Sequence, residues 1–411
     1  MPPTTSKLRS RVRDRGAVIA VAISVMTVAT YADQIVAARM LGPQDFGAFA
    51  ALMNLLLVVS VVSLGTQATA ARRIAADPGH VVEIERSVLQ VSYRLALILG
   101  LVLLALSPVI NIALRLESLT SAALVGITAI PFTMMGAQAG VLQGERRWGP
   151  LAVVYLAGGV PRLAIGTALI MWQPSEVMAV LGVTLGAVVP VIVGFVALRR
   201  PRTEIPDRTG LSAGPLLGEV MRGSQALLAF FALSNVDVMV ARNVLSGHDA
   251  GLYAAGLIMT KAVLFLPQFI VVVAFPSMSS EEQRGRTVWV ATTIITALGA
   301  TAVIGAWLFS GTAMIFVGGD KYADVESLLW LFAFLGTALS VLQLLVYAVL
   351  ARQGRKSIYA TWLAVVAVVG LGALSDSLQQ LLTVVACVDT ALLVGLVAAT
   401  VHRQRVPATA T

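Results

Sequence analysis

Twelve long apolar runs, separated by short polar breaks, occupy the chain from residue 16 to residue 401. A helix needs about 20 largely apolar residues to cross roughly 30 Å of hydrocarbon. Inside lipid, every backbone polar group must also be bonded within the protein. The runs therefore predict membrane-spanning α-helices, which we place at residues 16–38, 48–71, 87–110, 119–142, 150–172, 177–198, 224–246, 251–276, 287–310, 328–350, 357–375 and 380–401.

The composition agrees with a membrane protein. Of 411 residues, 58% are hydrophobic and 12% are charged, and the mean hydropathy is +0.87. Soluble domains carry about 25% charged residues, and a surface this apolar would aggregate in water. The first run follows the basic stretch 7–15, as in a signal peptide, but its length of 23 residues favours a retained helix.

Basic residues alternate between the breaks in a way that predicts the topology. With a cytoplasmic N-terminus, 22 of the 29 Lys and Arg residues fall in inner segments. Only Arg39, Arg115, Arg242 and Lys321 fall in outer loops. By the positive-inside rule, both termini are expected in the cytoplasm of a bacterial cell, with the chain in its plasma membrane. Anionic lipid of the inner leaflet accounts for the net charge of +8, so no nucleic-acid partner is expected.

The longest polar break divides the chain into two similar halves. We expect a basic N-terminus (1–15), a six-helix lobe (16–198), a cytoplasmic linker (199–223), a second six-helix lobe (224–401) and a cytoplasmic tail (402–411). A shift of 204 residues aligns the first run with the seventh, so that Asp33, Asp45, Gly47 and Phe49 fall on Asp237, Asp249, Gly251 and Tyr253. Six runs per half make this a parallel duplication, as in many transporters. The predicted fold is an all-α integral membrane protein with two such lobes around a central cleft.

One short segment carries a family resemblance. The residues Arg39-Met-Leu-Gly42-Pro43-Gln-Asp45-Phe46-Gly47, with Gly65-Thr66 ahead of Arg72-Arg73, resemble the start of polysaccharide-export and oligosaccharide-flippase proteins. Those proteins belong to the superfamily that also holds multidrug antiporters and lipid II flippases. The second half departs from the motif, with Ser246 and Gly247 in place of Gly42 and Pro43. The motif itself reads as a turn between helices, with Asp45 placed to cap the second one.

Three cations lie inside the predicted helices, where each needs a compensating interaction. Arg162 falls mid-span beside Pro161, Lys261 lies ten residues into its helix, and Arg94 lies close enough to an end to snorkel. Arg162, Lys261 and Arg94 are therefore candidates for binding an anionic substrate. The alternative for Arg162 and Lys261 is a structural pair with Asp389, which is also inside a predicted helix.

Acidic and uncharged polar residues complete the candidate set. Asp33 and Asp237 are interpreted as partners of Arg39 and Arg242 at the outer interface, with a proton or cation site as the alternative, to which Asp389 also belongs. Uncharged groups that suit a sugar lie within the predicted spans at Tyr31, Gln34, Asn235 and Gln268. Each of these could instead bond to a neighbouring helix.

Several functions find no support in the sequence. There is no GxxxxGK[ST] loop for ATP. One cysteine, Cys387, and three scattered histidines give no metal site, and no cofactor is expected. The longest outer loop, roughly Gly311 to Ser327, is too short for a catalytic domain, so no enzyme is expected.

The resemblance implies a flippase that moves a polyprenyl-phosphate- or pyrophosphate-linked saccharide outward by alternating access, for cell-surface polysaccharide synthesis. Glycosyltransferases or polymerases of the same pathway are the expected partners. The alternatives are a multidrug antiporter of the same superfamily, which would need buried carboxylates, and a non-transporting scaffold for wall-polymer enzymes. The membrane potential is expected to drive export, with proton or sodium antiport through Asp33, Asp237 or Asp389 as the competing scheme.

Overall fold

The computed structural model describes residues 5–77, 79–199, 213–265, 281–350 and 355–405, and these residues form helices joined by short turns. In the first part of the chain the helices are α1 (Thr5–Met40), α2 (Pro43–Val59), α3 (Val61–Ala76), α4 (Val81–Ala105), α5 (Ser107–Ala113), α6 (Leu119–Gly144), α7 (Trp148–Trp172) and α8 (Glu176–Leu198). In the second part they are α9 (Ala213–Val244), α10 (Gly247–Phe265), α12 (Glu281–Leu308), α13 (Ser310–Val317), the 3-10 helix η2 (Asp320–Leu328), α14 (Leu329–Leu350), α15 (Arg355–Gly372) and α16 (Leu378–Arg405).

The all-helical membrane fold predicted from the sequence is confirmed. Within the described residues, ten helical stretches are long and apolar enough to cross a membrane. The two remaining predicted runs correspond to α10, which the structure describes as far as Phe265, and to the shorter apolar helix α15. Within the described residues, every predicted run thus coincides with a helix or with a pair of consecutive helices; residues 266–276 of the run 251–276 lie outside them.

Proline and helix caps explain where several helices differ from their predicted bounds. The run 87–110 is divided at Leu106, where Pro108 lies in the first turn of α5 and cannot supply the backbone donor of a continuous helix. Ser118 and Ser175 cap α6 and α8, because their hydroxyls accept hydrogen bonds from Thr120 N and Met178 N. The sequence predicted an outer loop at Gly311–Ser327, whereas the structure has the helices α13 and η2 in this segment.

The chain forms two compact units. Unit 1 contains Met1–Leu41 and Leu56–Gln225, and unit 2 contains Gly42–Leu55 and Ala226–Thr411. The start of α2 therefore groups with the second half of the chain, although it belongs to the first half in sequence. The sequence places this segment in the lobe 16–198, whereas the structure groups it with unit 2.

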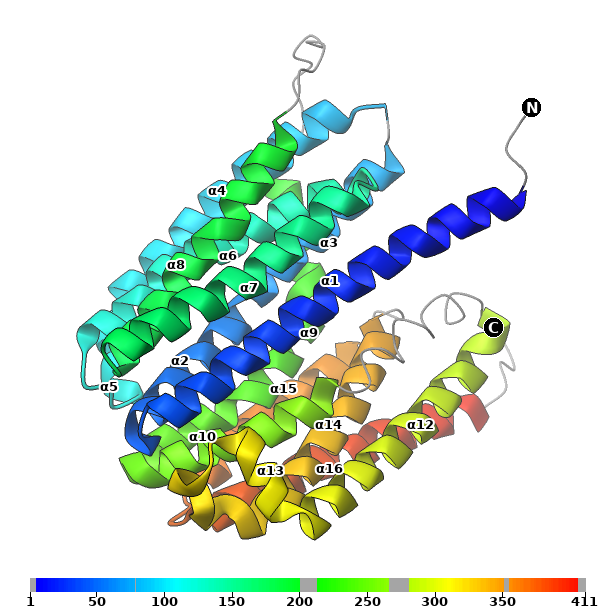
Figure 1. Cartoon of the computed structure of the whole chain (residues 1–411). Helices are drawn as coiled ribbons and strands as arrows, with labels where there is room; N and C mark the ends of the chain where they lie inside the picture. The colour runs from blue at the N-terminus through cyan, green and yellow to red at the C-terminus, as the bar shows by residue number, and fades with distance from the viewer. Residues whose placement is uncertain (1–4, 78, 200–212, 266–280, 351–354, 406–411) are drawn as a thin grey trace. The chain divides into compact units, whose positions relative to one another are not determined.

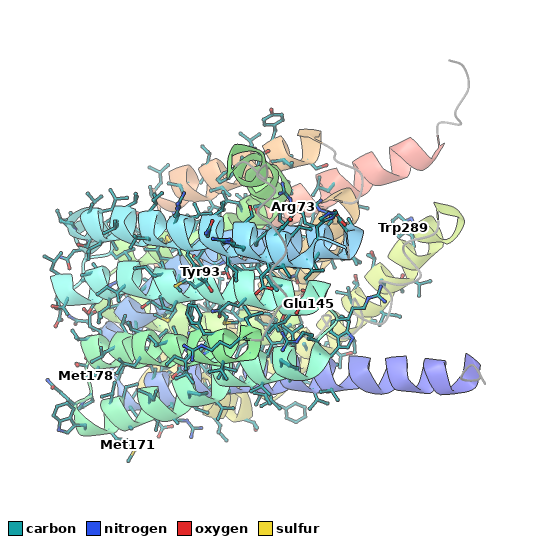
Figure 2. All side chains as sticks on the ribbon, turned by 90° about the horizontal axis from the view of Figure 1, so that it is seen from above. Arg73, Tyr93, Glu145, Met171, Met178 and Trp289 are labelled. Atoms are coloured by element: carbon teal, nitrogen blue, oxygen red, sulfur yellow. The ribbon has the colours of Figure 1, made fainter. Side chains whose placement is uncertain are left out.

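Unit 1 is built on long helices, of which α6 and α7 each pack against several others. Helix α7 packs against both α1 and α8, and α6 packs against α3, α4 and α8 (Figure 1). In Figure 2, Arg73 and Glu145 lie toward one end of this unit, and Met171 and Met178 lie toward the other. Tyr93, also labelled there, accepts a hydrogen bond from Gln138 Nε2 at 3.0 Å and joins α4 to α6.

Unit 2 is centred on α10 and α14. The ring of Phe332 packs edge-on against Tyr253 with centroids 5.5 Å apart, and it fills the space beside Gly256. Thr260 Oγ1 donates to Phe332 O at 2.8 Å, which links the same two helices. Helices α12 and α16 pack on α14, and α15 packs on α16. This arrangement brings mid-helix residues of α9, α10 and α16 into the interior.

Candidate functional site

A buried ion pair joins α1 to α7 in unit 1. Arg162 Nε donates to Asp33 Oδ2 at 2.9 Å, and the two residues are 9% and 2% exposed. A charge-assisted hydrogen bond of this kind is stronger than a neutral one. Loss of one partner would leave an uncompensated charge in the interior. The pair thus holds a permanent cation in the middle of a membrane-spanning helix.

Glycines allow the neighbouring helix backbones to approach this pair closely. A Cβ on Gly166 would lie 2.8 Å from Asp33 Oδ1, and one on Gly186 would lie 2.6 Å from the Cα of Arg162. Gly182 lies directly against Gly166 across the α7–α8 contact. Small residues at such interfaces let membrane helices pack at short distance. The position of Arg162 is therefore fixed by backbone contacts from α8 as well as by its carboxylate partner.

Unit 2 holds a second group of buried charges, which surrounds Asp237, the residue that the repeat aligns with Asp33. Asp237, 3% exposed, accepts hydrogen bonds from Tyr253 Oη at 3.0 Å and from Val238 N at 2.9 Å. Lys261 Nζ donates to Ser234 O at 2.6 Å and to Asn235 Oδ1 at 2.8 Å. Two equivalent aspartates thus have different surroundings in the two units.

Asp389 on α16 belongs to the same group. It is 1% exposed, and neither carboxylate oxygen has a hydrogen-bond partner among the described residues. It lies within electrostatic range of Asp237, which in turn lies within range of Lys261. A buried polar group without a partner is unusual and requires a physical explanation.

The structure corrects the pairings expected for the aspartates. Asp33 pairs with Arg162 on α7, not with Arg39 in its own helix. Asp237 bonds Tyr253, while Arg242 Nη1 donates to Gln44 O at 3.3 Å. Asp389 was the alternative partner for Arg162 or Lys261; the ion pair observed for Arg162 is with Asp33.

The remaining candidate residues lie in different surroundings. Tyr31 and Gln34 are half-buried on α1, on either side of Asp33 in sequence, whereas Arg94 is exposed on α4. Asn235 is buried and is brought together with Lys261. Gln268 lies outside the described residues. Arg162, Arg94, Tyr31 and Gln34 thus belong to unit 1, and Lys261 and Asn235 belong to unit 2.

The sequence interpretation missed two features of this interior. Tyr253 was not a candidate, although the repeat aligned it with Phe49 and so showed a hydroxyl that the first half lacks. Glu85 and Glu176 were not candidates either, yet both are buried, as are Asp33, Asp237 and Asp389. In the part of the chain that the structure describes, no three His, Cys, Asp or Glu side chains are grouped as metal ligands.

Comparison with known proteins identifies relatives at the level of family and fold. The family model described as polysaccharide biosynthesis protein matches residues 14–282, well over half of the chain. No curated protein sequence matches the chain significantly. Solved structures do match over nearly the whole chain.

Three of these structures illustrate the likeness. An inward-facing multidrug resistance MATE family transporter of the MOP superfamily gives a TM-score of 0.71 at 15% identity, over 94% of this chain and 98% of that one. The lipid II flippase MurJ in an inward closed conformation gives 0.70 at 11% identity, over 93% and 87%. A MOP superfamily transporter from Pyrococcus furiosus, whose binding pocket is described as reversed in polarity, gives 0.53 at 15% identity, over 95% of each chain. At these identities the likeness shows a MATE/MurJ-like fold.

Proposed function

Because the chain belongs to the polysaccharide biosynthesis protein family, we propose that it is a lipid-linked saccharide flippase. Members of this family are membrane transporters of the MOP superfamily and not enzymes. The substrate of this flippase would be a saccharide on polyprenyl phosphate or pyrophosphate. It would carry this substrate from the inner to the outer leaflet of a bacterial plasma membrane by alternating access of the lobes 16–198 and 224–401. A relative of the same fold is described as a lipid II flippase, which supports this substrate class.

The single observation that carries the proposal is the cation of Arg162 inside a membrane helix. An arginine at the bilayer centre costs about 2.5–3.5 kcal/mol on insertion scales, and ionisable residues at this depth commonly mark substrate pathways. A phosphate about 4 Å from a guanidinium gains roughly 4 kcal/mol at an effective dielectric constant of 20. The planar guanidinium presents its N–H donors in a rigid fork that matches the geometry of a phosphate group.

Other residues would complete the binding of the substrate. Tyr31 and Gln34, on the helix that carries Asp33, offer neutral hydrogen-bonding groups suited to sugar hydroxyls. Exposed Arg94 would attract the anionic headgroup during entry. Lys261, expected from the sequence to share the phosphate with Arg162, already donates to two fixed oxygens of α9, so we assign the phosphate to Arg162.

The energy source follows from the sign of the substrate charge. With the cell interior negative, each exported negative charge gains about 2.3 kcal/mol per 100 mV. A dianionic pyrophosphate would gain roughly 4.6 kcal/mol, a bias of more than a thousandfold. The test is flipping in reconstituted vesicles with an imposed potential and no ion gradient. Flux that ignores the potential and follows a proton or sodium gradient would favour antiport instead.

Two rival functions make different predictions. A multidrug antiporter would hold a cationic drug on buried carboxylates, and Asp33 and Asp237 are buried. The family match favours a saccharide, and expression of the chain would then leave drug resistance unchanged. A scaffold for glycosyltransferases or polymerases predicts that the buried cations can be neutralised without loss of export.

The decisive experiment separates substrate binding from a purely structural ion pair. Arg162→Gln alone would leave Asp33 buried and uncompensated, and Asp33→Asn alone would do the same to Arg162, so thermal unfolding first checks that each variant folds. The informative pair is Asp33→Asn, which keeps the cation, and the double variant Asp33→Asn with Arg162→Gln, which removes it. Export of the lipid-linked saccharide is measured at matched protein levels. We expect Asp33→Asn to export and the double variant to lose export, with Arg39→Gln at the exposed end of α1 as the control. Export by a folded double variant would refute the role of Arg162.

A further inference from the structure

The ammonium group of Lys261 occupies a set of oxygens of the kind that bind cations. Its partners are the backbone oxygen of Ser234 at 2.6 Å and the amide oxygen of Asn235 at 2.8 Å. The amide is held in this orientation because Asn235 Nδ2 donates to Phe231 O at 2.7 Å and to Ser234 Oγ at 3.0 Å. Backbone carbonyl and amide oxygens are common ligands of hard cations such as alkali and alkaline-earth ions.

Two carboxylates of this group, Asp237 and Asp389, lie within electrostatic range of each other. Asp237 receives hydrogen bonds from Tyr253 and from a backbone N–H, whereas Asp389 receives none from the described residues. The residues come from α9, α10 and α16, three helices of unit 2. Ionisable groups at this depth in a membrane protein commonly mark ion or proton pathways.

The charges of this group do not balance without a proton. One ammonium and two ionised carboxylates would leave a net charge of −1 in a buried site. A carboxylate without donors is strongly disfavoured in an apolar interior and takes up a proton instead. Asp389 lacks donors and Asp237 has two, so the proton that neutralises the group belongs on Asp389.

We propose that Lys261 is a tethered cation that takes the place of a metal ion in this site, and that the exchangeable ion is a proton on Asp389. When water reaches Asp389, the carboxyl group transfers its proton to that water and becomes a carboxylate, and the group changes from neutral to −1. Asp389 on α16 lies within electrostatic range of Asp237 on α9 and Tyr253 on α10, and Asp237 lies within range of Lys261 on α10. Of the helices packed on α16, α14 has no ionisable group among its described side chains, and Tyr359 of α15 is 70% exposed.

This inference goes beyond the flippase proposal and does not depend on the substrate. It assigns Lys261 to this buried charge group and not to substrate binding. It also predicts that removal of the ammonium creates a site for Na⁺, since the oxygens and at least one carboxylate stay in place. Sodium would then be bound by the altered chain and not by the natural one.

The first experiment measures thermal unfolding of the purified full-length protein, without substrate, as NaCl replaces N-methylglucamine chloride at constant ionic strength. We expect no response of the natural chain and a saturable rise in unfolding temperature for Lys261→Ala. Lys261→Arg, which keeps the cation, and Lys321→Ala, the same truncation on η2, should not respond. A saturable sodium response of the natural chain, or none in folded Lys261→Ala, would overturn the tethered-cation role.

The second experiment detects the proton directly and remains informative if Lys261→Ala does not fold. Infrared spectra of the protein should contain the carbonyl stretch of a buried protonated carboxyl group. The band should lose intensity in Asp389→Asn and keep it in Asp33→Asn, because Asp33 is ion-paired with Arg162. An unchanged band in Asp389→Asn would refute the proton site, since the buried carboxyls Glu85 and Glu176 can add to the band but cannot hide the loss of one group. Neither measurement uses transport, so failure of the flippase proposal would leave both results interpretable.

Discussion

Gly47 and Gly251, equivalent positions of the internal repeat, are in direct contact with each other. A Cβ on Gly47 would lie 3.0 Å from the Cα of Gly251, and a Cβ on Gly251 would overlap the backbone of Pro43. The N-terminal turns of α2 and α10 therefore pack against each other backbone to backbone. This contact explains why Gly42–Leu55 groups with unit 2.

The contact predicts that Gly251 cannot accept even a methyl group. Gly251→Ala should lower stability by about 1–3 kcal/mol, the usual effect of overpacking, because the obstacle is backbone and cannot rotate away. Thermal unfolding in detergent measures the change. Gly42→Ala is the matched control, since a Cβ there would meet nothing within 4 Å. Equal unfolding temperatures for the two variants would contradict the close packing.

A disulfide can test whether this contact opens during transport. A Cβ on Gly247 would lie 3.3 Å from Gln44 Cγ, close to the roughly 3 Å between a sulfur and the opposite Cβ in a disulfide. With Cys387 replaced by Ser, the double variant Gln44→Cys, Gly247→Cys should cross-link on oxidation. A protease site inserted within 200–212 would reveal the link as two fragments that separate only after reduction.

If alternating access requires the two turns to separate, the oxidised protein should be inactive and the reduced protein active. Each single-cysteine variant, treated with the same oxidant, controls for oxidation itself. Full transport by the cross-linked protein would show that the contact is permanent.

The turn between α3 and α4 predicts a pH-dependent ion pair. His80 Nδ1 lies 2.9 Å from Asp77 Oδ2, and this hydrogen bond raises the pKa of His80 above 6.5 and lowers the pKa of Asp77 below 3.8. The ion pair stabilises the folded protein at pH values between the ordinary pKa values of the two groups, 3.8 for Asp77 and 6.5 for His80. The contribution is lost as the pH rises through the raised pKa of His80 or falls through the lowered pKa of Asp77. NMR titration of labelled histidine, assigned with His80→Gln, should show that Asp77→Asn lowers the pKa of His80.

The sequence predicted the helices because a membrane span is a local property. About 20 apolar residues suffice to cross the bilayer, so α6, α7 and α8 could be read from the chain almost to the residue. The duplication was also visible, and its alignment of Asp33 with Asp237 marked the two aspartates that the structure places in buried charge groups.

The partners of those aspartates could not be read from the sequence. Spacing along a helix shows only neighbours three and four residues away, and it therefore suggested Arg39 and Arg242. The actual partner of Asp33 is Arg162, 129 residues later, because the rotation of α7 and its contact with α1 depend on glycines packed against α8. The hydroxyl of Tyr253 and the backbone oxygen that holds Lys261 are likewise set by how α9 and α10 pack. Chain composition thus determined which helices exist, and packing among them determined which charges meet.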